Sequence, residues 1–204
     1  MTRLALLFSL LFLSSASGNQ IENPTEPIFI SQETELHKVG SSMTAVEQKV
    51  RGAAVRIINK EFGGHGTGSV IKHKGFTLVL TASHVVSGQP GNAYYAIKDN
   101  EIKKMYLIYS DEANDIAVLF LMEEFENIEP IKFNPRDDIL EIGEEITYSG
   151  FPASHQLMSF RGKVAGYEDL PDIGRQIMLH TYGWFGCSGS VIFDSKGRIA
   201  GILW

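Results

Sequence analysis

The stretch that decides the fold lies near the end of the chain and reads GCSGSVIFDSKGRIAGI at residues 186–202. A glycine-rich turn opens it, and an apolar run at 190–193 follows directly. The residues SKG at 195–197 then make a turn before a second apolar run at 199–203. Two short apolar runs on either side of turn residues predict a β-hairpin. The stretch therefore predicts two paired strands that begin at a tight glycine-serine turn.

Short apolar or alternating segments, separated by turn residues, continue through most of the chain. The other predicted strands are 53–58, 68–71, 76–80, 94–97, 105–109, 116–121, 145–149, 162–167 and 176–181. No apolar stripe of helical period is sustained over three turns, so the sequence predicts an all-β fold. An acidic stretch at 123–138 looks like a connection between two halves. The pattern fits either two barrels with a cleft between them or a single sandwich.

Gly186 and Ser188 have the spacing that nucleophilic catalysis by a serine requires. A glycine two residues before the nucleophile lets the backbone N–H groups of both residues point at one spot, where they stabilise developing negative charge. Gly189 then lets the chain leave the turn without a side chain that blocks the site. Ser188 is therefore the candidate nucleophile, and Gly186 and Ser188 are the candidate oxyanion hole.

A serine hydroxyl needs a general base, and His84 is the candidate because it follows the predicted strand at 76–80. Asp115 directly precedes the strongly apolar segment 116–121, a costly place for a carboxylate unless a partner pairs with it. The imidazole N–H of His84 is a natural partner for that carboxylate. The sequence thus predicts a triad of His84, Asp115 and Ser188.

In the order histidine, aspartate, serine, these segments resemble the chymotrypsin-like serine proteases, and among them the bacterial HtrA/Deg-type and glutamyl endopeptidase-type enzymes. The resemblance covers about residues 50–204 and is carried by GTGSVI at 66–71, DIAVL at 115–119, the turn at 143–152 and the stretch at 188–202. It implies two antiparallel six-stranded β-barrels with the catalytic cleft between them. Relatives continue with a further strand and a C-terminal helix. The second barrel is therefore expected to be truncated, either because the chain is a fragment or because it is a shortened form whose second barrel is completed otherwise.

The resemblance also implies an activity, that of a serine endopeptidase that cleaves protein or peptide substrates. Ser188 would attack the scissile carbonyl, His84 would take and return the proton, and Asp115 would orient His84. The N–H groups of Gly186 and Ser188 would hold the oxyanion, and an acyl-enzyme would form and be hydrolysed. No metal or other cofactor is expected.

Two further points concern the residues around the predicted site. Cys187 is an alternative nucleophile, but the family's nucleophile is followed by glycine, as Ser188 is, so Cys187 is expected to be a packing residue or a site of oxidative inhibition. Tyr182 and Leu203 are expected by analogy to line the substrate pocket. Glutamyl endopeptidases carry a histidine where Leu203 stands, so a preference for glutamate is disfavoured. Tyr182 carries no charge that would attract a lysine or arginine side chain of the substrate. An apolar or small side chain before the cut is therefore expected.

The first 18 residues are predicted to be a signal peptide, because Arg3 precedes an apolar run at 4–13 and then small residues. Cleavage is expected near Ala16 or Gly18. A membrane anchor is disfavoured, because about 20 apolar residues are needed to cross a bilayer. We therefore expect a secreted or periplasmic protein with no stable membrane insertion after cleavage.

Composition and charge limit the remaining organisation and partners. We expect a polar arm or linker at 19–49 and one folded domain at 50–204, divided into a first barrel at 50–122, a connection at 123–142 and a second barrel at 143–204. The formal net charge is −6 and no lysine- or arginine-rich run is present, so nucleic acid is an unexpected partner. The single cysteine excludes an intrachain disulfide, and the histidines lack zinc-ligand spacing. The sequence does not indicate an oligomeric state.

Two alternatives of other classes fit parts of the sequence. The chain could be a catalytically inactive, protease-like binding module, which the shortened second barrel favours and the complete triad disfavours. It could also be a secreted β-rich interaction protein in which the motifs match by accident. That reading requires that His84, Asp115 and Ser188 do not converge in the folded chain.

Overall fold

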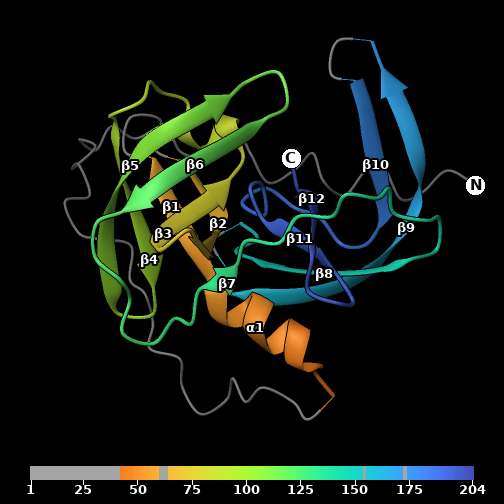
Figure 1. Ribbon diagram of the computed structural model, residues 1–204, viewed down its shortest axis with the longest axis horizontal. Helices are drawn as coiled ribbons and strands as arrows, with labels where there is room; N and C mark the ends of the chain where they lie inside the picture. The colour runs from red at the N-terminus through yellow and green to blue at the C-terminus, as the bar shows by residue number, and fades with distance from the viewer. Residues whose placement is uncertain (1–41, 60–63, 154, 172–173) are drawn as a thin grey trace, which may run out of the picture. The chain divides into compact units, whose positions relative to one another are not determined.

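The computed structural model describes residues 42–59, 64–153, 155–171 and 174–204. The predicted signal peptide and residues 19–41 of the predicted arm lie outside the described residues. Strands dominate the described part, as the alternating apolar pattern predicts (Figure 1). Within these ranges, no helix has the length and apolar character needed to cross a bilayer.

The first half of the domain is a closed barrel of six antiparallel strands. Its strands are β1 (Ala54–Asn59), β2 (Gly64–His73), β3 (Phe76–Thr81), β4 (Ala93–Lys98), β5 (Glu101–Asp111) and β6 (Ile116–Leu121). The strand order is β1-β4-β5-β6-β3-β2, and pairing of β1 with β2 closes the ring. Its interior is apolar and fully buried because one face of every strand carries aliphatic side chains. This half supplies the loops that hold His84 and Asp115.

The second half is a curled five-stranded antiparallel sheet. Its strands are β8 (Glu145–Gly150), β9 (Met158–Leu170), β10 (Gly174–His180), β11 (Val191–Asp194) and β12 (Ile199–Ile202), in the order β10-β9-β8-β11-β12. The prediction of a chymotrypsin-like double barrel with a truncated second barrel is confirmed. The predicted hairpin at 190–203 is β11 and β12, and the long hairpin of β9 and β10 stands out in blue in Figure 1.

The connecting segment between the halves is mostly irregular and contains one short strand, β7 (Ile131–Lys132). β7 pairs in parallel with the end of β2. Nearby, an apolar core is shared by the two halves: Val191 and Phe193 of β11 pack with Ile71 and Leu80 of the barrel. This shared core fixes the position of the turn at 186–189, which carries Ser188 and precedes β11, relative to the barrel.

A short helix, α1 (Ala45–Ala53), was not predicted from the sequence. It begins with a capping box, in which the Thr44 hydroxyl accepts from the Glu47 N–H and the Glu47 carboxylate accepts from the Thr44 N–H. Glu47 also pairs with Arg161 of β9, and this contact holds the pKa of Glu47 at about 2. Val50 enters the shared apolar core. The helix therefore lies against β8 and β7 and ties the start of β1 to the second sheet (Figure 1).

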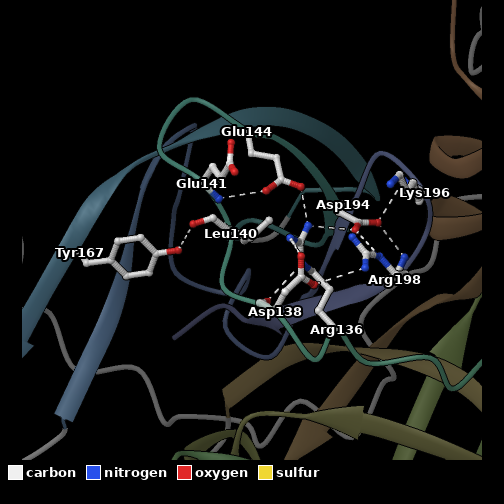
Figure 2. Close-up of polar contacts among 9 residues, drawn as sticks. All are labelled: Arg136, Asp138, Leu140, Glu141, Glu144, Tyr167, Asp194, Lys196 and Arg198. Carbon is white, nitrogen blue, oxygen red and sulfur yellow. Dashed lines mark hydrogen bonds and ion pairs between the residues drawn. The ribbon is translucent and has the colours of Figure 1, made fainter.

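A buried ionic network stabilises the hairpin of β11 and β12 (Figure 2). The Asp194 carboxylate, 1 % exposed, pairs with Arg198 at 2.8 Å and with Arg136 at 3.1 Å. Arg136 also contacts Glu144 and lies 2.7 Å from Asp138. Asp194 accepts from the backbone N–H groups of the following turn as well, and these bonds lower its pKa against the effect of burial. The network fixes the end of β11 on the connecting segment.

Candidate active site

His84 lies on the single turn of 3₁₀ helix η1 (Ser83–Val86) that follows β3. Val85 and Val86, the last two residues of this turn, are buried in the barrel core, while the His84 side chain is 48 % exposed at the surface. The position agrees with the prediction that this histidine follows a strand. Its imidazole therefore faces solvent at the edge of the closed barrel.

Asp115 stands at the start of β6 with a φ of +52°, in the left-handed region that a non-glycine residue seldom occupies. Its Oδ2 lies 2.7 Å from Nδ1 of His84, so Nδ1 carries the proton and donates to the carboxylate. Oδ1 accepts from the His84 N–H at 2.9 Å and from the Ser83 hydroxyl at 2.8 Å. Both oxygens of the Asp115 carboxylate thus accept hydrogen bonds, and the bond to Oδ2 fixes which imidazole nitrogen of His84 is protonated.

Ser83 was missed in the sequence. Its hydroxyl is buried and donates to Asp115 across a separation of 32 positions in the chain. The only local signal is its place next to His84, which does not distinguish a hydroxyl that bonds the carboxylate from one that caps the turn.

Ser188 lies in the turn that enters β11, and this turn packs against the barrel beside the His84 segment. The Ser188 carbonyl accepts from the Thr67 N–H of β2 at 2.8 Å. A Cβ on Gly66 would lie 2.6 Å from the Val85 side chain and 3.0 Å from the Ser188 carbonyl, so only glycine lets the two segments meet here. The backbone of Ser188 thus contacts β2 close to Val85, the residue after His84.

No hydrogen bond joins the Ser188 hydroxyl to the His84 ring, although the structure describes both residues. Bonds of this kind are often long before substrate binds. The His84 and Asp115 pair is therefore formed, and the Ser188 hydroxyl is not bonded to it.

The backbone around Gly186 is oriented by hydrogen bonds to its carbonyl groups. The Phe185 carbonyl accepts from the Ala153 N–H at 2.6 Å, and the Cys187 carbonyl accepts from the Ser190 N–H at 2.9 Å. In a trans peptide the C=O and the next N–H point in opposite directions, so the N–H groups of Gly186 and Ser188 point away from these partners. In the described part of the chain neither N–H donates to a backbone carbonyl. Both can donate to an oxyanion.

Cys187 is fully buried in the core of the second sheet with Tyr148 and Ile192. Burial raises the pKa of its thiol, so the nucleophilic thiolate is disfavoured. Ser188 is half-buried instead. Between these two neighbours, the geometry favours the serine as the nucleophile.

Tyr182 and Leu203, the two predicted pocket residues, differ in their surroundings. The Tyr182 ring is 53 % exposed and stacks on Phe160 at 5.4 Å, while Leu203 packs on the core of the second sheet. The Gly189 N–H donates to the Leu203 carbonyl at 2.7 Å, which holds the end of β12 beside Ser188. Their role in substrate binding remains a prediction.

A cavity of about 510 Å³ lies elsewhere, at the junction of the barrel with the connecting segment and β12. Its walls are mostly aliphatic, and none of the predicted triad residues lines it. In the residues that the structure describes, no group of three or more His, Cys, Asp and Glu side chains is arranged to hold a metal ion. We therefore place the candidate site at His84, Asp115 and Ser188 rather than at the cavity.

Solved structures share this fold at low sequence identity. The chain is similar to an inactive form of Rv3671c from M. tuberculosis, with a TM-score of 0.62, 19% identity and coverage of 78% of this chain and 77% of that one. Deg5 gives a TM-score of 0.60, 22% identity and coverage of 77% and 81%. The HtrA-type protease AlgW with a tripeptide gives a TM-score of 0.64 and 20% identity, with coverage of 77% of this chain and 52% of that one. At these identities the likeness establishes the fold.

Comparison of the sequence with models of protein families assigns the chain to a family, which the solved structures alone do not do. None of the curated proteins matches the sequence. The model of the trypsin-like peptidase domain, however, matches residues 66–202, which is more than half of the chain and includes the candidate His84, Asp115 and Ser188. This chain belongs to the trypsin-like peptidase family, and its fold is that of the HtrA-type proteases.

Proposed function

We propose that the protein is a serine endopeptidase with His84, Asp115 and Ser188 as its triad. The observation that carries the proposal is the 2.7 Å hydrogen bond between His84 and Asp115 beside a turn that presents Ser188. A protonated Nδ1 leaves Nε2 as the basic nitrogen that takes the proton of the serine hydroxyl.

In the first step the Ser188 oxygen bonds to the scissile carbonyl carbon, and its proton passes to Nε2 of His84. The N–H groups of Gly186 and Ser188 stabilise the oxyanion, each worth roughly 3 to 4 kcal/mol in comparable sites. The imidazolium then returns the proton to the leaving amine, and an acyl-enzyme remains. Water, deprotonated by the same imidazole, hydrolyses the ester and restores Ser188. Asp115 keeps its negative charge throughout and stabilises the imidazolium.

Substrate preference and location are part of the same proposal. The exposed Tyr182 ring and the aliphatic Leu203 carry no charge, which supports a preference for an apolar or small side chain before the cut. The predicted signal peptide at 1–18 supports export to a secreted or periplasmic location. N-terminal sequencing of the exported protein checks the cleavage near Ala16 or Gly18.

The direct test is labelling of the purified mature protein with a fluorescent fluorophosphonate, beside a Ser188→Ala variant. We expect labelling that Ser188→Ala abolishes and His84→Ala strongly reduces, with all three proteins equally folded by circular dichroism. A folded wild-type protein that stays unlabelled would instead support the binding-module alternative.

A further inference from the structure

Thr67 of β2 is fully buried, and all of its polar groups are bound to the surroundings of the candidate site. Its N–H donates to the Ser188 carbonyl at 2.8 Å, and its carbonyl accepts from the Thr81 hydroxyl at 2.7 Å. Its hydroxyl donates to the Gly186 carbonyl at 2.7 Å and accepts from the Phe151 N–H at 3.1 Å. This one hydroxyl thus joins the nucleophile turn to the loop that follows β8.

These bonds determine how the Gly186 N–H points. The peptide group on its N-terminal side is held because the Ala153 N–H donates to the Phe185 carbonyl. The peptide group on its C-terminal side is held because the Thr67 hydroxyl donates to the Gly186 carbonyl. Gly186 has a φ of +95°, and a Cβ there would lie 2.4 Å from the Phe151 carbonyl. The peptide group on the C-terminal side is also held by the Cys187 N–H, which donates to the Trp184 carbonyl at 2.9 Å. Because both flanking peptide groups are fixed, the N–H between them cannot rotate away from the site unless these bonds give way.

The loop that supplies Ala153 depends on the same hydroxyl. Ala153 has a φ of +48°, a strained conformation that persists only where neighbouring contacts hold it. Phe151, two residues earlier, is held at its N–H by Thr67 and at its carbonyl by Nε2 of His65, at 3.1 Å. The Arg56 guanidinium covers the Phe151 ring, 4.9 Å from its centroid. Loss of the Thr67 hydroxyl therefore removes the bond to the Gly186 carbonyl and one of the two hydrogen bonds that hold Phe151 next to the Ala153 turn.

We infer that Thr67 is a positioning residue for the oxyanion hole: its hydroxyl holds the nucleophile turn and the 151–153 loop in the arrangement that turns the Gly186 N–H toward substrate. The inference rests on the proposed function, because it concerns the same oxyanion hole. Thr67 does not touch substrate, so its effect is on the rate of the chemical step and not on the binding of a small probe.

Two substitutions separate the hydroxyl from the shape of the side chain. Thr67→Val keeps the branched shape and removes the hydroxyl, which leaves the Gly186 carbonyl and the Phe151 N–H buried without this partner. Thr67→Ser keeps the hydroxyl and removes the methyl group, and so serves as the matched control. If Thr67→Val does not fold, Thr67→Cys takes its place, because a thiol is only a weak donor.

The experiment measures the reaction of wild type and variants with the fluorophosphonate, divided into the maximal rate kinact and the half-saturation constant KI, with rates corrected for the folded fraction. For Thr67→Val we expect kinact to fall about ten- to hundredfold, since loss of a whole oxyanion donor costs about 10²- to 10³-fold. The KI of Thr67→Val should stay within about twofold of the wild-type value. The kinact of Thr67→Ser should stay within about threefold of the wild-type value, the range that a well-tolerated change leaves.

Three results would overturn the inference and leave the proposed function intact: a wild-type kinact in Thr67→Val, an equal loss in Thr67→Ser, or a loss fully explained by the unfolded fraction. In each of these the wild type still labels at Ser188. A folded wild type that does not label overturns the proposed function, and the inference falls with it.

Discussion

The buried Ser83 hydroxyl donates to Oδ1 of Asp115 at 2.8 Å, while Oδ2 of the same carboxylate accepts from His84 at 2.7 Å. One carboxylate oxygen is thereby anchored by its surroundings and the other is left for the imidazole. The φ of +52° at Asp115 is a strained conformation that persists only where surrounding contacts hold it, and the bonds from Ser83 and His84 are such contacts.

Replacement of Ser83 by alanine should lower the fluorophosphonate labelling rate about tenfold, because a hydrogen bond to a charged group is worth about 1.5 to 3 kcal/mol. Ser83→Thr keeps the hydroxyl and should label faster than Ser83→Ala. Stopped labelling reactions at pH 7.5, with a thermal melt of each variant, check the prediction. Equal rates in wild type and Ser83→Ala would show that the carboxylate needs no anchor.

Glu47 of α1 should stabilise the fold in a pH-dependent way. Its pKa is about 2 in the folded chain, against 4.5 for a free side chain, mainly because Arg161 donates to it. The folded state therefore binds fewer protons, and the stabilisation is complete above about pH 4.5 and is lost as the pH falls toward 2. Since Arg161 is 61 % exposed, we expect Glu47→Gln to cost only about 1 to 2 kcal/mol at pH 7.

Urea unfolding of wild type and Glu47→Gln at pH 7, 4 and 2.5 measures this difference. The two curves should approach each other as the pH falls. A gap that stays constant down to pH 2.5 would mean that Glu47 stabilises the helix by shape and not by charge.

His65 should make the fold less stable in weak acid. Burial lowers the pKa of its imidazole from 6.5, and the nearby Arg56 lowers it further, against the bond to Phe151. The unfolded chain then takes up a proton that the folded chain resists, so stability is complete above pH 6.5 and falls as the pH is lowered from there. The melting temperature of His65→Gln, measured from pH 7.5 to 5, should depend less on pH than that of wild type. Parallel curves for the two proteins would refute this.

Replacement of Ser190 by alanine should stabilise the protein. In the described chain, its hydroxyl is the buried side-chain polar atom that lacks a hydrogen-bond partner. A buried unsatisfied hydroxyl costs about 1 to 3 kcal/mol, and we expect Ser190→Ala to recover about 1 kcal/mol of it after the loss of packing. Urea unfolding at pH 7 measures the change, with Ser195→Ala, at an exposed turn position, as the control. A destabilised Ser190→Ala would indicate that the hydroxyl is bonded in solution.

The strands could be predicted because each one is a short apolar or alternating run between turn residues. In β2 and β5 the strand pairing extends beyond the predicted ends, mostly through polar residues and glycines that this pattern does not detect. The all-β fold was thus readable from local periodicity. Helix α1 was not, because nine residues are too few to show a sustained apolar stripe. The spacing of Thr44 and Glu47 in its capping box was the local signal available.

His84, Asp115 and Ser188 could be predicted as candidates because each stands in a recognisable segment. The contacts of Ser83 and Thr67 could not, because their partners Asp115 and Gly186 lie 32 and 119 positions away. A hydroxyl beside a strand end has many local uses, and only the folded chain shows which carboxylate or carbonyl it reaches.

The two parts of the candidate site are carried by elements that differ in how readily they unfold locally. His84 and Asp115 are carried by a ring of strands in which each strand has two neighbours. The turn that holds Ser188 is instead bonded, through the Gly189 N–H, to Leu203 at the end of β12, which has one neighbouring strand in the described sheet. Edge strands and the turns attached to them open first, at a cost below that of global unfolding. Brief excursions of the second sheet could therefore separate the serine from its base while the histidine and aspartate stay paired, so the lifetime of the assembled site would be shorter than that of the folded barrel.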